Sequence, residues 1–171
     1  MENFKNISIR GRVAYLLSSF EKLLLYHNCE KAEWQGILDK LWTYTSIKFL
    51  DDWMYMIAEY MPNSILQDSF DDAEYITQQE FERLKEIYGK SHNDIRIFMQ
   101  IIYECATCEL YSKLYDYSPI TLRKIEDAVN ILVENGIELV DIQPFKQYVF
   151  DEANGWGICF QGAEKHSLFN N

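Results

Sequence analysis

Cys105 and Cys108 form the only C-x-x-C motif of the sequence. A structural zinc site needs a second pair of Cys or His ligands at similar spacing, but Cys29 and Cys159 each stand alone. A redox-active pair opens a helix that follows a strand, where the helix terminus lowers the thiol pKa. Here the motif lies inside an apolar helical stretch. The sequence therefore predicts two buried, reduced, structural thiols.

The three histidines are His27, His92 and His166. None of them belongs to a Glu-x-x-His pair of the di-iron type or to an H-E-x-x-H motif. His27 lies at the C-terminus of the first predicted helix, whose dipole favours a partly charged imidazole there. We therefore predict a structural role for His27 and no metal ligands.

Glu104 and Glu109 lie in the same apolar stretch as the two cysteines. They are either buried acids with a raised pKa or groups on an exposed edge that pair with a base. The glycines around Trp156 match neither G-x-G-x-x-G nor the P-loop, and no G-x-S-x-G motif is present. We predict no catalytic residue and no cofactor.

Charge is distributed unevenly along the chain. Sixteen Lys and Arg face 27 Asp and Glu, which gives a net charge of −11. No base lies between Lys48 and Arg83, and this interval carries nine of the acids together with several aromatic residues. Acidic and aromatic side chains on one surface suit a basic protein partner. We predict partner contacts at Asp51, Asp52, Asp68, Phe70, Asp71, Asp72, Glu74 and Tyr75.

Two other interpretations of this acidic interval remain open. One is a solvated face that only aids solubility. The other is a calcium loop, although residues 68–74 lack the D-x-D-x-D-G order of an EF-hand. Clustered bases for nucleic acid or anionic lipid are missing, so neither partner is expected.

Length and hydropathy predict a single domain over residues 1–171 in the cytoplasm, as a monomer or weak homodimer. The apolar run near the N-terminus is broken by Arg10 and Arg12 and is not typical of a signal peptide. No apolar stretch reaches membrane-spanning length.

Apolar residues recur at helical spacing over residues 8–27, 34–45, 50–61, 77–89, 93–115 and 118–135. The sequence predicts a mainly α bundle of about six helices, followed by a non-helical segment, residues 137–171, packed on it. The stretch 93–115 is apolar on nearly every side, which is typical of a central helix. We expect Trp34, Trp42 and Trp53 to pack against it.

Several helix ends carry recognisable signals. Thr77 and Glu80 form a capping box, and Ser118 with Pro119 is a typical helix start. Pro62 ends the preceding helix, while Gly89 and Asn135-Gly136 are suited to left-handed helix ends. IELVDI and QYVF, after residue 136, are candidates for short strands.

Four segments together resemble bacterial immunity proteins of polymorphic or contact-dependent toxin systems. They are W-x-x-I-L-x-x-L-W (Trp34–Trp42), LDDW (Leu50–Trp53), E-x-x-P (Glu59–Pro62) and the tail PF…F-x-E-x-N-G-W-G (Pro144–Gly157). The resemblance implies a small, cytosolic, non-enzymatic protein that binds and neutralises a toxin domain, often a nuclease. It supplies no residue-level binding motif.

The leading hypothesis is therefore an immunity protein whose partner is a basic cognate toxin. One alternative is a helical adaptor or regulator with a different protein partner. Another is an enzyme that uses Glu104, Glu109 or a histidine, which would require a deep polar pocket.

Overall fold

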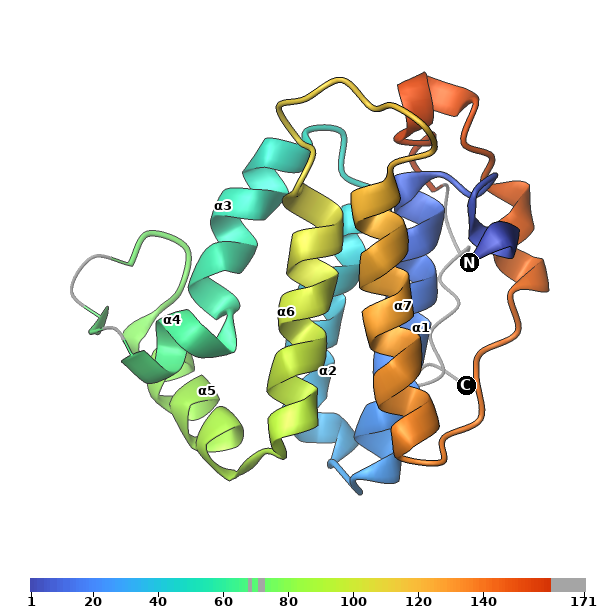
Figure 1. Ribbon diagram of the computed structural model, residues 1–171. Helices are drawn as coiled ribbons and strands as arrows, with labels where there is room; N and C mark the ends of the chain where they lie inside the picture. Colours follow the sequence, from blue (N-terminus) through green and yellow to red (C-terminus); the bar gives the residue numbers. More distant parts are fainter. Residues whose placement is uncertain (68, 71–72, 161–171) are drawn as a thin grey trace.

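The structure is a computed structural model that describes residues 1–67, 69–70 and 73–160. These residues form a bundle of six helices with eleven or more residues each and one shorter helix (Figure 1). The predicted mainly α fold is confirmed. The helices are α1 (Ile9–Tyr26), α2 (Lys31–Trp42), α3 (Leu50–Tyr60), α4 (Pro62–Gln67), α5 (Gln78–Lys90), α6 (Asn93–Thr107) and α7 (Pro119–Glu134).

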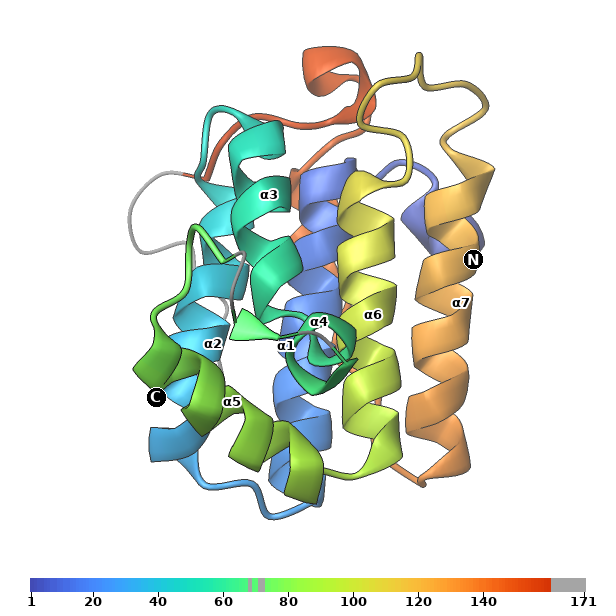
Figure 2. The same ribbon diagram turned by 90° about the vertical axis from the view of Figure 1, so that its left-hand side faces the viewer.

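Helix α1 occupies the centre of the bundle, with α2, α6 and α7 packed beside it (Figures 1 and 2). Of its 18 residues, 15 are buried, which is the burial expected for a helix covered on all sides. The prediction that the stretch after residue 93 is the central helix is therefore wrong. Helix α6 packs between α1, α3 and α7, but it leaves Ile97 exposed.

Helix α6 is also shorter than predicted. It ends at Thr107, with Cys108 as its C-terminal cap, and residues 108–118 form a link to α7. Cys105 is buried in the last turn, as expected, but Cys108 is exposed at the helix end. The prediction of two buried thiols is therefore wrong for Cys108.

Three buried tryptophans anchor α2 and α3. Trp34 packs edge-on against Phe20 of α1 at 5.9 Å between ring centroids. The Trp42 indole N–H donates to the buried carboxylate of Glu21 on α1 at 2.8 Å. Trp53 stacks on a tyrosine of α6. The expected packing against α6 is thus found for Trp53, whereas Trp34 and Trp42 contact α1.

Arg12, in the first turns of α1, has no solvent exposure and connects distant parts of the chain. Its guanidinium donates to the carbonyls of Phe4 at 3.2 Å, Lys5 at 3.0 Å and Tyr117 at 2.7 Å, and to the Thr121 hydroxyl at 2.6 Å. Burial lowers the pKa of Arg12 to about 10, so it stays charged at neutral pH. The N-terminus, the 108–118 link and α7 are therefore held by one side chain.

Arg10 plays a similar role on the other side of α1. It donates to the carbonyls of Gly157 at 3.2 Å and Ile47 at 2.8 Å, and also to that of Tyr44. The C-terminal segment and the α2–α3 connection are joined through it. Such charge-assisted bonds to backbone carbonyls stabilise a buried guanidinium.

Residues 137–160 pack on α1 and the N-terminus and contain the 3-10 turns η4 (Gln143–Gln147) and η5 (Glu152–Gly155). Residues 161–171 of the predicted C-terminal segment lie outside the described residues. The predicted strands do not form. Among the described residues the β pairing is one isolated bridge, Ile7 with Val149. Gly157 has a φ of +82°, and a Cβ there would lie 2.7 Å from the Ser8 Cβ. A side chain is therefore excluded from this turn.

The helix ends follow the predicted signals in most cases. Thr77 accepts from the Glu80 amide at 3.2 Å, and Ser118 caps α7. Gly136 has a φ of +69°, as expected, but α5 continues through Gly89 to Lys90, so the predicted left-handed end at Gly89 is wrong. His27 caps the C-terminus of α1.

The expectation of a favoured charged imidazole at His27 is wrong, because burial and the neighbouring His92 lower its pKa.

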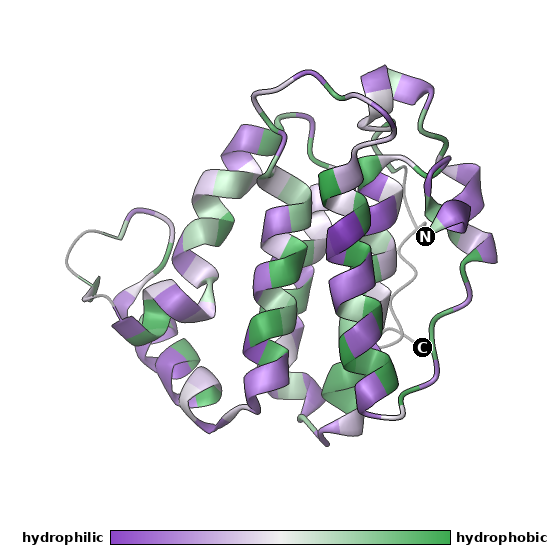
Figure 3. Cartoon of the chain, viewed as in Figure 1, coloured by the Kyte–Doolittle hydropathy of each residue, from purple (hydrophilic) through white to green (hydrophobic). Residues whose placement is uncertain are grey.

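Polar residues are interspersed along the helices (Figure 3). Within the described part of the chain, every helix is too short or too polar to cross a membrane.

Candidate partner-binding surface

The acidic interval folds along one edge of the bundle. It supplies α3, α4 and the start of α5, which lie together on the side of α6 away from α7 (Figure 1). The acidic residues of the interval that the structure describes therefore lie on one side of the molecule. Asp68, Asp71 and Asp72 lie outside the described residues.

Asp51 and Asp52 occupy the first turn of α3. Carboxylates at this position are stabilised by the positive end of the helix dipole, so they have a structural role as well. Asp52 is exposed and Asp51 is half-buried. Both carboxylates remain accessible to a partner.

Three exposed aromatic rings surround these carboxylates. Phe49 precedes α3, Tyr55 lies one turn into it, and Tyr111 projects from the 108–118 link. Their exposed fractions are 57 %, 55 % and 74 %. The neighbouring Tyr55 hydroxyl, together with smaller effects that include the charge of Asp51, raises the pKa of Tyr111. We call Phe49, Asp51, Asp52, Tyr55 and Tyr111 the α3 patch.

Glu74 and Tyr75 lie at the other end of α3. The Glu59 carboxylate accepts from the Glu74 amide at 2.9 Å and from the Tyr75 amide at 2.7 Å, which fixes this turn of backbone. The side chains of Glu74 and Tyr75 are exposed. Asp51 and Glu59 are separated by roughly 12 Å along the helix axis, so the structure does not bring the two groups of predicted residues together.

Phe70 differs from the other predicted contact residues. It is half-buried and packs edge-on against Phe81 at 5.9 Å between ring centroids, at the margin of the core. Trp53 and Tyr60, also within the acidic interval, are buried. These rings hold the edge together and offer little surface to a partner.

The two glutamates proposed for catalysis have structural partners. Glu104 pairs with Lys124 of α7 at 2.5 Å and accepts from Gln100 at 2.9 Å. Partial burial would raise its pKa, but these hydrogen bonds and the Lys124 charge outweigh burial and lower it. Glu109 accepts a hydrogen bond from Ser118. Glu104 therefore does not have the raised pKa of a buried acid.

Sequence reasoning missed Tyr111 as a surface residue because it placed this residue inside a long helix. The run of polar and aromatic residues from Tyr111 to Ser118 was the available signal for a link.

Comparison of the chain with protein-family models, with curated proteins and with solved structures found no match.

Proposed function

We propose that this chain is a non-enzymatic immunity protein that acts in the cytoplasm by binding a basic toxin domain through the α3 patch. The observation that carries the proposal is the grouping of three exposed aromatic rings and two accessible carboxylates at one end of α3. The sequence segments that resemble immunity proteins support the same function.

The chemistry of the α3 patch fits a basic protein surface. Exposed aromatic rings fill pockets on a partner and supply most of the binding energy at interface centres. The carboxylates of Asp51 and Asp52 accelerate encounter with a positively charged partner. A nuclease domain is one such partner, because an enzyme that binds nucleic acid presents basic residues to phosphates.

The residues that carry the resemblance have mostly structural roles. Trp34, Trp42 and Trp53 are buried, and Gly157 sits where a side chain would clash. LDDW also contains Asp51 and Asp52 of the α3 patch. The resemblance therefore describes a scaffold together with one accessible acidic turn.

Growth rescue tests the proposal. The chain is co-expressed with the toxin domain encoded next to it, and the wild type should restore growth. The double variant Phe49→Ala/Tyr55→Ala should fail to protect, since loss of central aromatic contacts weakens binding by about tenfold or more per ring.

Exposed aliphatic residues on α7, across the bundle from α3, provide the control. Val133 and Ile120 are exposed on α7, and Ile120→Ala/Val133→Ala should protect like the wild type. Absence of protection by the wild-type chain would contradict the immunity function. Binding of a different, non-toxic partner through the α3 patch would instead favour the adaptor.

A further inference from the structure

Three side chains that can bind metal converge at the end of α6 away from the α3 patch. His27 caps the C-terminus of α1, His92 is the N-cap of α6, and Asp94 lies in its first turn. One ligand atom from each lies within 4.8 Å of the others. The two imidazole rings stack with 4.3 Å between centroids. Sequence analysis missed this group because His27 lies far from His92 and Asp94 along the chain.

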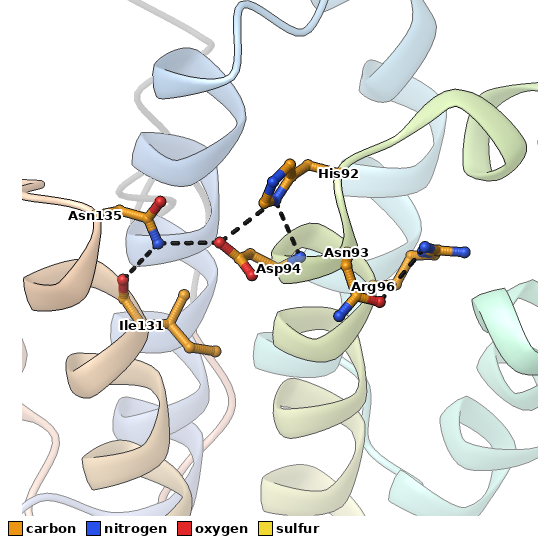
Figure 4. A network of polar contacts seen from close by, with 6 residues as sticks. All are labelled: His92, Asn93, Asp94, Arg96, Ile131 and Asn135. Carbon is orange, nitrogen blue, oxygen red and sulfur yellow. Dashed lines mark hydrogen bonds and ion pairs between the residues drawn. The ribbon is translucent and has the colours of Figure 1, made fainter.

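His92 and Asp94 are in contact at the start of α6. His92 Nδ1 lies 3.4 Å from the Asp94 Oδ2, and the same Nδ1 accepts from the Asp94 amide at 3.3 Å (Figure 4). A neutral ring nitrogen has one lone pair, which either accepts from the amide or binds a cation. A cation bound there would also be attracted by the Asp94 carboxylate, 3.4 Å away.

His27 supplies the third candidate ligand. Its Nε2 is buried and has no hydrogen-bond partner among the described residues. Burial and the neighbouring His92 lower its pKa, which favours the neutral imidazole that binds metals. The C-terminal end of α1 also presents partial negative charge to a cation.

Asp94 is held in place by α7. The Asn135 side-chain amide donates to Asp94 Oδ2 at 3.0 Å and to the Ile131 carbonyl at 2.9 Å (Figure 4). A hydrogen bond from a residue that is not itself a ligand orients a carboxylate for metal binding. His27 and His92 line a hollow of about 620 Å³, which leaves room for a further ligand.

We propose that His27, His92 and Asp94 bind a divalent first-row transition-metal ion, with Zn²⁺ as the representative. Two imidazole nitrogens and one carboxylate oxygen form a donor set typical of zinc sites with three protein ligands and one open position. The ion would join the end of α1 to the start of α6. The proposal stands independently of the proposed function, since the α3 patch lies beyond the other end of α6.

Direct observation of the imidazole nitrogens tests the site. The full chain, without a histidine tag and stripped of metal with EDTA, is titrated with ZnCl₂ while the ¹⁵N resonances of the rings are recorded. The ring resonances of both His27 and His92 should move to metal-bound positions at one equivalent. The proposal is overturned if either ring keeps its metal-free resonances, or if both respond only to pH.

Two variants keep the local structure while removing ligands. His92→Asn retains an N-cap side chain for α6, and Asp94→Asn retains an oxygen that accepts from Asn135. Each should weaken Zn²⁺ binding, measured by calorimetry, by at least about tenfold. Glu126→Gln removes an exposed carboxylate on α7 and should bind like the wild type. Wild-type affinity in both ligand variants would contradict the site, and circular dichroism confirms that each variant is folded.

Discussion

At the scale of single residues, Arg12 connects the fold to the candidate surface. Its guanidinium donates to the Tyr117 carbonyl. Tyr117 is the middle one of three consecutive non-glycine residues with positive φ, between Asp116 and Ser118. Left-handed backbone at such residues costs free energy and persists only where surrounding contacts impose it. The link that carries Tyr111 therefore depends on a buried arginine of α1.

Replacement of Arg12 should weaken the fold. Arg12→Met keeps much of the apolar volume but leaves several carbonyls without a donor, so we expect a loss of about 3 kcal/mol or more in the free energy of unfolding. Urea denaturation measures it. Lys124→Met, which removes a half-exposed ion pair, serves as the control and should cost less than about 1 kcal/mol. Equal losses in both variants would contradict the role of Arg12.

His27 should make stability depend on pH. Its pKa is lowered from the ordinary value of 6.5 by burial and by His92. The unfolded chain then binds more protons, so this contribution is present above pH 6.5 and is lost as pH falls toward the folded pKa. In EDTA, His27→Gln should lose less stability than the wild type between about pH 7.5 and about pH 5. The same pH dependence in both proteins would refute this assignment.

At the scale of helices, local signals placed most boundaries correctly. Apolar spacing located the long helices, and Thr77, Ser118 and Gly136 marked their ends as predicted. The end of α6 was missed because apolar spacing continues through Cys108 and Leu110, whereas the chain leaves the helix at Thr107. The predicted strands were wrong because QYVF forms only an isolated bridge with the N-terminus among the described residues. In IELVDI, the Glu138 and Leu139 carbonyls accept from the Lys22 ammonium.

Ser118 is the residue through which the 108–118 link enters α7. Its hydroxyl accepts from the Thr121 amide at 3.4 Å and also bonds Glu109. Ser118→Ala should cost about 1 to 2 kcal/mol, in the range of a lost N-cap. It should also speed hydrogen exchange in the link. Ser112→Ala, at an exposed position of the same link, should change stability by less than about 0.5 kcal/mol. A Ser118 effect as small as that of Ser112 would contradict the capping role.

At the scale of the whole molecule, the sequence predicted which segment carries the charge but not how its residues are grouped. The base-free interval lies along one edge, as α3, α4 and the start of α5. Burial of Trp53 and Tyr60 and the contact of Phe70 with the core depend on tertiary packing, which spacing does not reveal. The pairing of Tyr55 with Tyr111, and that of His27 with His92, joins distant segments and was equally hidden.

The association rate with the basic toxin domain, measured at low and high salt, tests the role of the α3 patch most directly. Asp51→Lys/Asp52→Lys should slow association by about tenfold at low salt and reduce its salt dependence, because complementary charge acts mainly on encounter. Glu126→Lys/Glu134→Lys makes the same change in net charge at exposed positions of α7. That control should slow association much less. Equal slowing by the two double variants, or none in either, would contradict binding through the α3 patch.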